Sequence, residues 1–180
     1  MARAAAILEL AFLCLASSAQ AEDGGSAFRF FERLCLSRGP DYERTVATAE
    51  TSGWLPLPAE VLVGLAPLAN PEAVEGWAIS GNDLPQRMIL EISKHTLSGK
   101  LVHACTIVAF GINSIEFEKA FFQRTDGEAI QQARSATHVH KLFSLDLSGR
   151  SELVTLTVPV ESNGADNLMA SSIAEAEWEN

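Results

Sequence analysis

The segment spanning residues 86–110 constrains the fold of this chain more than any other. Apolar and polar side chains alternate over residues 86–94, which predicts a β-strand with one buried face. Ser98 and Gly99 then mark a tight turn, and residues 101–110 are nearly all apolar or β-branched, as in a strand near the centre of a sheet. The segment therefore predicts an antiparallel hairpin around which the other elements must pack.

Helical patterns precede this hairpin in two places. Residues 26–38 carry apolar side chains three and four positions apart, and Gly39 and Pro40 end the pattern. A second helix is predicted from Asp41, a good N-cap residue, to Gly53, a good terminator. Shorter elements are predicted between the second helix and the hairpin: an extended connection at 54–58, a helix at 59–65, a single turn opened by Asn70 and Pro71, a strand at 77–79 and a turn at 80–83.

A third helix and a second hairpin follow. Asn113 and Glu116 have capping-box spacing, which predicts a helix that starts at Asn113 and ends by Gly127. The remaining elements are two predicted strands and one polar stretch without a clear prediction: 138–147, 152–160 and 128–136. Together these elements predict a single α+β domain over residues 22–160. Its helices pack mainly on one face of an antiparallel, hairpin-rich sheet.

The charge of the chain is unevenly distributed. The sequence has 23 Asp and Glu against 13 Lys and Arg, a formal net charge of -10. This balance argues against nucleic acid or an anionic membrane surface as the main partner, since both need a positive face. Residues 161–180 contain five acids and no base, a composition typical of a solvated segment. They are therefore predicted to form an acidic C-terminal tail outside the domain.

Residues 1–21 predict a cleaved signal peptide. Arg3 precedes an apolar stretch, and Ala19 and Ala21 give the small-x-small pattern that signal peptidases accept. A membrane anchor is the alternative, but the stretch is shorter than the roughly 20 apolar residues that span a bilayer. Cleavage before Glu22 would place the chain in the periplasm or outside the cell, with no membrane span in the mature protein.

Two cysteines, Cys35 and Cys105, remain after that cleavage. An even number of cysteines in an exported chain predicts a disulfide, because oxidising compartments form and keep such bonds. In the chain-entropy model, a bond that closes the loop between Cys35 and Cys105 stabilises the fold by about 4 kcal/mol. Two separate buried thiols are the alternative.

The common catalytic and cofactor motifs are absent from the sequence. It contains no Gly-x-Gly, so it has neither a dinucleotide fingerprint nor a P-loop. It also lacks Gly-x-Ser-x-Gly, Ser-x-x-Lys, Cys-x-x-Cys and His-Glu-x-x-His. No cofactor is predicted, and an enzyme is not favoured. Carboxylate-based sites leave weak local signatures, however, so a hydrolase without a recognisable motif is a further alternative.

Histidines supply the remaining candidate site residues. His138 and His140 are separated by one residue on a predicted strand, so both side chains share a face. Such a pair binds zinc or copper when a third ligand arrives from another element. His103 and Cys105 share a face in the same way and form a candidate nucleophile pair, which a disulfide would remove. Ordinary polar side chains on a solvent-facing strand are the alternative for His138 and His140, and the His103–Cys105 pair is disfavoured because catalytic partners usually come from different elements.

The order of a few residues gives a resemblance. A cysteine ends the first predicted helix, Gly-Trp follows the second helix, and a second cysteine lies in a strand before a capped helix; these positions are Cys35, Gly53, Trp54, Cys105 and the helix after Asn113. Over residues 28–124 this layout resembles small exported bacterial proteins of unassigned function. The resemblance implies an exported, disulfide-linked α+β domain and brings no catalytic or ligand residues.

The sequence thus predicts an exported α+β domain that binds an unidentified protein or small molecule, or has a structural role. Periplasmic metal binding through His138 and His140 is the alternative function. A hydrolase whose carboxylate or cysteine site leaves no local motif is the third.

Overall fold

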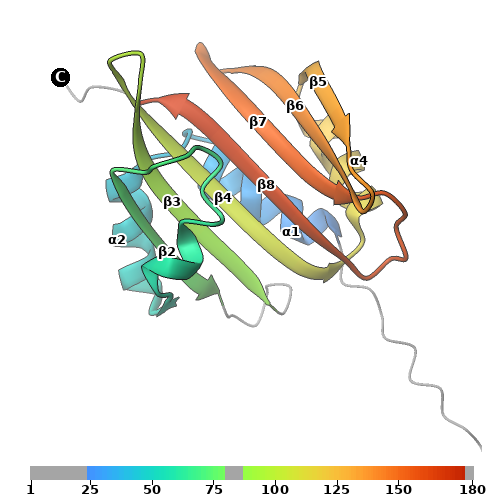
Figure 1. Ribbon diagram of the computed structural model, residues 1–180, viewed down its shortest axis with the longest axis horizontal. Coiled ribbons are helices and arrows are strands. Elements are labelled where there is room, and N and C mark those ends of the chain that lie inside the picture. The colour runs from blue at the N-terminus through green and yellow to red at the C-terminus, as the bar shows by residue number, and fades with distance from the viewer. Residues whose placement is uncertain (1–23, 80–86, 177–180) are drawn as a thin grey trace, which may run out of the picture.

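An eight-stranded antiparallel sheet forms the centre of the protein (Figure 1). The computed structural model describes residues 24–79 and 87–176. The strand order is β1-β2-β3-β4-β8-β7-β6-β5, and each strand runs antiparallel to its neighbours. The strands are β1 Leu55–Pro56, β2 Ala73–Ile79, β3 Met88–Leu97, β4 Lys100–Ile112, β5 Glu128–Arg134, β6 His138–Leu147, β7 Arg150–Pro159 and β8 Asp166–Glu175. The predicted hairpin is β3–β4, and it lies in the interior of the sheet as expected.

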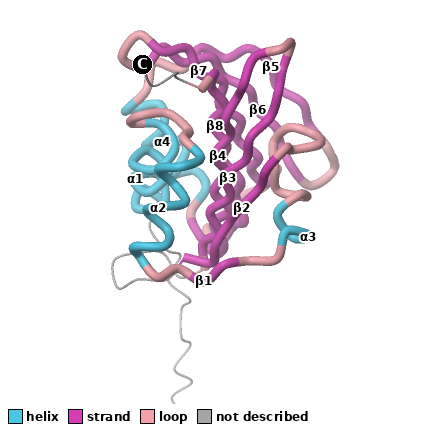
Figure 2. Tube along the Cα trace, turned by 90° about the vertical axis from the view of Figure 1, so that its left-hand side faces the viewer, coloured by secondary structure: helices cyan, strands magenta, loops and turns pink. Residues whose placement is uncertain are grey.

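Helices cover one face of this sheet, which we call the helix face. They are α1 (Gly24–Phe31), the π-helical turn η1 (Glu32–Leu36), α2 (Tyr42–Ser52) and α4 (Ser114–Arg124). Figure 2 views the layers from the side, with these helices on one side of the strands and the short helix α3 (Ala59–Leu62) on the other. The predicted α+β class, with helices mainly on one face, is confirmed.

The predicted caps set the helix boundaries. The Asp41 carboxylate accepts the Arg44 N–H at 2.7 Å, which satisfies an otherwise unpaired donor at the start of α2. Gly53 ends the same helix in the left-handed conformation, with φ at 64°. At the start of α4, Asn113 Oδ1 accepts the Glu116 N–H at 3.2 Å. Both helices on either side of the hairpin thus begin where the sequence predicts.

The first predicted helix changes geometry before it ends. It is α-helical through Phe31 and then widens into η1, where the Ser37 N–H donates to the Glu32 carbonyl at 2.8 Å, five residues back. Cys35 lies in this widened turn, and Cys105 lies in β4. Their Sγ atoms are 2.00 Å apart, which confirms the predicted disulfide. The bond fastens the helical layer to the middle of the sheet.

Aromatic side chains fill the space between the helices and the sheet. Phe28 of α1 packs edge-on against Phe117 of α4, with ring centroids 5.6 Å apart. Phe121 of α4 continues the cluster to Phe143 of β6 at 5.1 Å. All four side chains are buried, and each buries enough apolar area to stabilise the fold by about 2 to 3 kcal/mol. The helix face is therefore an apolar core.

Residues 57–72, which include α3, cross the opposite face of the sheet and are called the strap. Figure 1 shows the strap in front of β2 and β3. Its first residue, Leu57, donates its N–H to the Gly76 carbonyl at 2.9 Å, and its last residue donates to the Lys94 carbonyl at 2.8 Å. Leu62 of the strap is buried against the sheet, and a Cβ added at Gly76 would lie only 2.5 Å from the Leu62 Cδ2 atom. A glycine at this position thus permits the close approach of strap and sheet. We call this side of the sheet the strap face.

The prediction of an acidic tail at 161–180 is wrong for Asp166–Glu175. These residues form β8, which lies between β4 and β7 inside the sheet. Leu168 and Ala170 pack into the core of the helix face. Ser171, Ser172 and Ala174 are also buried, but alanine and serine side chains bury little apolar area and give a weak strand pattern. The five acids of residues 161–180 instead suggested a solvated segment.

Two smaller predictions also change. The ambiguous stretch 128–136 contains β5, which pairs only with β6 and exposes every residue, so its sequence has no burial alternation to reveal it. Asn70 opens no helical turn; its backbone takes the left-handed conformation, with φ at 55°. Asparagine tolerates this conformation better than most residues, so it serves as a bend in the strap.

Some predictions fall on other parts of the chain. The signal peptide at 1–21 and the turn at 80–83 lie outside the described residues. Over residues 24–79 and 87–176, no helix has the length and apolar composition needed to cross a membrane.

Candidate functional site

The histidine pair lies as the sequence predicts, on one face of β6. The ring centroids of His138 and His140 are 6.5 Å apart. The Nδ1 atom of His138 is 2.9 Å from the Thr137 hydroxyl, and that of His140 is 3.0 Å from the Thr157 hydroxyl. Within the part of the chain that the structure describes, no group of three His, Cys, Asp or Glu side chains converges to hold a metal ion. The third ligand that a metal site needs is therefore not supplied by these residues.

His103 lies against the start of α2. Its neighbour in the predicted nucleophile pair, Cys105, is consumed by the disulfide. His103 Nδ1 accepts the Tyr42 N–H at 3.4 Å, so the ring helps to cap α2 in its neutral form. Burial lowers the pKa of His103, although the carboxylates of Glu43 and Asp41 oppose that shift. The imidazole is thus held in the state that accepts the helix N–H.

Tyr42 extends this contact toward the edge of the sheet. Its hydroxyl donates to Glu75 Oε1 at 3.1 Å, and the Lys94 ammonium lies 4.5 Å from its ring centroid. Burial and the Glu75 carboxylate raise the pKa of Tyr42 to about 12, so the phenol remains a donor at neutral pH. These contacts fasten α2 to β2 and β3.

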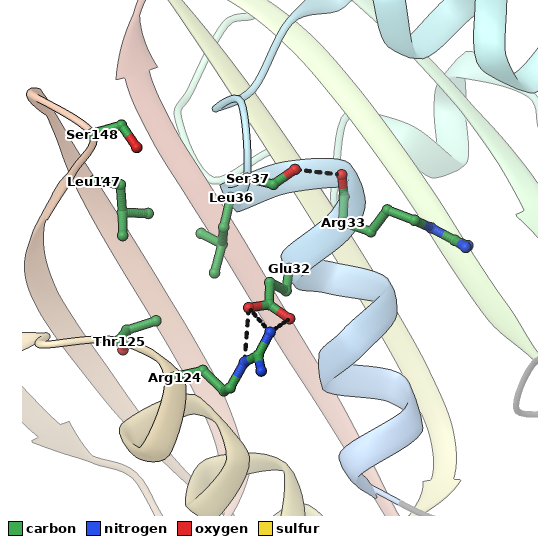
Figure 3. Close-up of a pocket in the computed structure, with 8 residues that line it drawn as sticks. All are labelled: Glu32, Arg33, Leu36, Ser37, Arg124, Thr125, Leu147 and Ser148. Atoms are coloured by element: carbon green, nitrogen blue, oxygen red, sulfur yellow. Dashed lines mark hydrogen bonds and ion pairs between the residues drawn. The ribbon is translucent and has the colours of Figure 1, made fainter.

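A hollow of about 400 Å³ lies where η1, the end of α4 and the β6–β7 turn meet (Figure 3). An ion pair between Glu32 and Arg124, 3.0 Å between the closest atoms, spans it. Leu36 and Leu147 supply apolar side chains to its lining. Because its two facing charges neutralise each other, this hollow offers no net charge to a ligand.

A second hollow, of about 490 Å³, lies between η1 and α2, and we call it the arginine hollow. Its lining is basic, hydroxylic and aromatic: Arg33, Leu34, Ser37, Arg38, Arg44, Thr45, Thr48, Ser52 and Trp54. Arg33 and Ser37 line both hollows. In Figure 3, however, the Arg33 side chain extends away from Arg124 and Leu147. Its guanidinium therefore contributes to the arginine hollow rather than to the neutral one.

The local fold explains why three arginines meet there. The wide π-helical turn ends at Leu36, and the chain then reverses at Gly39, where φ is 70°. This reversal brings Arg44 of α2 back beside Arg33 and Arg38. π-Helical turns occur frequently at functional sites, and here the turn orients both the disulfide and one of the arginines.

The strap face contains buried polar side chains in a row. Register places Glu91 of β3 opposite Thr106 of β4, Thr106 opposite Ser171 of β8, and Ser171 opposite Thr155 of β7. Glu91, Thr106 and Ser171 are completely buried. The Thr106 hydroxyl donates to Ser171 Oγ at 2.9 Å. Next to Glu91 along β3, the buried Ser93 Oγ lies 3.0 Å from His95 Nε2.

Glu91 is the least satisfied member of this row. Neither of its carboxyl oxygens has a partner with hydrogen-bond geometry among the described residues. Burial raises the pKa of Glu91 to about 7, and the nearby hydroxyls of Ser93 and Thr106 only partly offset that effect. The carboxyl group is therefore largely protonated below neutral pH.

A buried acid on the helix face is better paired. Glu152 Oε2 accepts the Ser172 hydroxyl at 2.6 Å, and its Oε1 accepts the Arg150 Nε–H at 2.7 Å. Arg150 also donates to the Leu36 carbonyl at 3.1 Å. Burial still raises the pKa of Glu152, against the opposing effect of Ser172 and Arg150. The pair joins β7 and β8 to the end of η1.

A shallow hollow of about 260 Å³ lies at the outer end of the polar row. Its lining joins the strap to β5–β8: Pro67, Gln131, Ala133, His140, Lys141, Leu142, Thr155, Thr157 and Met169. Of the sequence-predicted site residues, only His140 lines a hollow described here. Its ring contacts Thr157, and no acid belongs to the lining.

Comparison with protein-family models, curated proteins and solved structures gives no match. The fold and its hollows define the class to which the protein belongs, a disulfide-linked α+β domain with an eight-stranded antiparallel sheet. Of the hollows described above, the arginine hollow has three basic side chains and no acid in its lining.

The arginines that line this hollow are not among the sequence-predicted site residues. Arg33, Arg38 and Arg44 lie within 12 residues of one another in a strongly acidic chain, and this local excess of basic residues was the available signal. The spacing alone did not show their convergence, because it depends on the π-helical turn and on the reversal at Gly39.

Proposed function

We propose that the chain is an exported domain, periplasmic or secreted, that binds a partner molecule and is not an enzyme. The observation that carries the proposal is the buried Cys35–Cys105 disulfide, which joins η1 to β4. Such bonds persist in oxidising compartments and are rare in reducing ones. The signal-peptide pattern at residues 1–21 supports the same location.

Binding rather than catalysis is supported by the chemistry of the hollows. The only cysteine nucleophile predicted from sequence is part of the disulfide. The arginine hollow is lined by guanidinium and hydroxyl groups, which donate hydrogen bonds that hold and orient a ligand. A rigid, cross-linked scaffold that presents such a hollow fits a binding domain.

The test is expression of the full chain in a Gram-negative host, followed by fractionation, N-terminal sequencing and intact mass measurement. We expect a periplasmic protein that begins at Glu22 and has no thiol available to alkylation before reduction. A Cys35→Ala/Cys105→Ala variant serves as the control for the alkylation step. An uncleaved chain in the cytoplasm, or two reactive thiols in the mature protein, would contradict the proposal.

Metal binding through His138 and His140 is the second candidate function, and the shared face of the two rings favours it. Calorimetric titration of metal-free protein with zinc and copper tests it. Binding that disappears in His140→Ala but persists in His103→Ala would support the site. Heat no greater than that of the buffer control would remove it.

A further inference from the structure

The arginine hollow concentrates positive charge on an acidic protein. The chain has 13 Lys and Arg against 23 Asp and Glu, yet three arginines and no acid line this hollow. Like charges held together repel one another unless a counter-charge balances them. The hollow therefore carries an electrostatic cost that a bound anion would remove.

Two of the three guanidinium groups lack an acidic partner in the described residues. Arg44 is partly neutralised by Asp41, with 3.7 Å between the closest atoms. The Arg33 guanidinium lies over the Phe30 ring, 5.3 Å from its centroid, and this contact leaves its charge uncompensated. Arg38 is exposed and makes no ion pair with residues 24–79 or 87–176. An entering anion thus meets two guanidinium groups that lack an acidic partner among the described residues, and a third, that of Arg44, which already contacts Asp41 and donates to the Gly39 carbonyl.

The walls of the hollow are fixed in place. On one side, η1 is bonded to the sheet through Cys35. On the other, α2 is capped by Asp41. Trp54 closes the lining and packs against Phe30, with 6.0 Å between the ring centroids. Because these walls are already ordered, binding would not have to order them, which favours affinity.

We infer that the arginine hollow binds a small organic oxyanion with at least two negative charges, such as a phosphate monoester or a polycarboxylate. This inference rests on the proposed function and names the ligand class of the binding domain. The guanidinium fork matches the oxygen geometry of phosphate and carboxylate groups. The volume of about 490 Å³ is within the range of small-molecule sites, and Trp54 offers an apolar surface to the organic part of the ligand.

The test is calorimetry and tryptophan fluorescence on the mature, oxidised protein. The probes are glycerol 3-phosphate, citrate and inorganic phosphate, each compared with sodium chloride at equal ionic strength. We expect saturable binding of glycerol 3-phosphate or citrate with a dissociation constant below about 1 mM. Whichever of these two probes binds more tightly shows whether the hollow prefers a phosphate ester or a polycarboxylate. Trp54→Phe should retain the heat of binding and lose the fluorescence change.

Arginine variants separate a defined site from general charge. Arg38→Gln and Arg33→Gln should each weaken binding about tenfold or more, because each removes a charge-assisted contact. Arg38→Lys should weaken it less, since it keeps the charge but loses the fork. The matched control is Arg134→Gln, which removes the same charge from exposed β5 and should leave the affinity unchanged. Circular dichroism confirms that each variant is folded.

Three outcomes would overturn the inference. These are no saturable binding of any probe, an effect reproduced by sodium chloride alone, and an equal loss of affinity in Arg134→Gln and Arg38→Gln. The proposed export is judged separately, from the cleavage site and the oxidised cysteines. A cleaved, oxidised protein that binds none of the probes would leave the exported domain intact and eliminate its assigned ligand.

Discussion

The two faces of the sheet each bury a glutamate, and the two are treated differently. On the helix face, Glu152 is bonded to Arg150 and Ser172. On the strap face, Glu91 is buried as completely, yet its carboxyl oxygens lack hydrogen-bond partners among the described residues. The helix face therefore contains a satisfied ion pair within an apolar core. The strap face contains an acid whose ionisation opposes folding.

The layers that cover the two faces also differ in how firmly they are held to the sheet. The helix face is bound to its helices by a disulfide and by aromatic packing. The strap is held by backbone hydrogen bonds at its ends and by Leu62, its one buried side chain, while Val61 and Val63 remain about half exposed at 48% and 52%. We therefore expect the helix face to determine global stability and the strap face to respond to pH and to open locally.

Removal of the disulfide should have the largest effect. Cys35→Ala/Cys105→Ala frees a loop with a sequence separation of 70 residues. The chain-entropy model gives a loss of about 4 kcal/mol in the free energy of unfolding. Urea denaturation of oxidised wild type and variant measures this loss. A loss below about 1 kcal/mol would mean that the helical layer does not depend on its covalent link.

Glu152→Gln should be next in size. It leaves the partly buried Arg150 guanidinium without its carboxylate, and breaking such a pair costs about 3 kcal/mol. Urea denaturation at pH 7 measures the change, and Glu50→Gln, which alters an exposed acid on α2, is the control. An unchanged midpoint would remove the contrast between the two faces, since neither buried acid would then stabilise the fold.

Glu91→Gln should have the opposite sign. The pKa of Glu91 in the folded protein, about 7, is above its ordinary value of 4.5. The folded state therefore binds the proton more tightly than the unfolded state. Wild-type stability should fall as the pH rises from about 4.5 to about 7, and the full penalty of about 3 kcal/mol should be present at pH 8.

The variant removes this penalty because its amide does not ionise. At pH 8 it should be more stable than wild type by about 3 kcal/mol, and at pH 4.5 the difference should largely vanish. Urea midpoints across this pH range measure both values. A pH-independent difference would show that Glu91 does not titrate in this window.

Gly76→Ala tests the seat of the strap and should have the smallest effect of the four. The added methyl group would lie 2.5 Å from Leu62 Cδ2 and 2.6 Å from the Leu90 carbonyl oxygen, so the strap or β3 must move. We expect a loss of about 1 to 2 kcal/mol. Proteinase K should also cleave faster within residues 57–72. Gly64→Ala, also in the strap, is the control for loss of a glycine, because its added Cβ would lie 3.7 Å from the Val61 carbonyl oxygen, an ordinary van der Waals contact. Equal cleavage rates in both variants would contradict a tightly seated strap.

The sequence predicted those elements whose signals are local. Asp41 and Asn113 cap α2 and α4, and the β3–β4 hairpin lies where alternation and its turn indicate. The disulfide was predicted from the parity of the cysteines. The strand β8 was missed because alanine and serine are buried there by neighbours distant in sequence. Burial of that kind leaves no local periodicity.

The candidate site was less predictable than the fold. His138 and His140 do share a face, since strand periodicity alone determines that result. The convergence of Arg33, Arg38 and Arg44 depends on a π-helical turn, and no propensity rule used for the sequence distinguishes such a turn from an α-helix. Glu91 could have been noticed as a lone acid among apolar residues in a central strand. Whether its carboxyl oxygens find hydrogen-bond partners among the described residues depends on β2, β4, β8 and the strap, which are distant in sequence.

The position of β8 has a consequence for the order in which the protein folds. This strand is the last in the sequence, yet it joins β4 to β7 and so connects the two halves of the sheet. Until it is in place, β4 and β7 are open edges, and the two halves are linked through the helical layer, by contacts such as Phe121–Phe143 and Arg150–Leu36. Such distant pairing slows folding, because the loop must close before any contact is gained. The sheet thus stays incomplete until β8 pairs with β4 and β7, and a truncation before residue 166 should leave those two strands as exposed edges prone to aggregation.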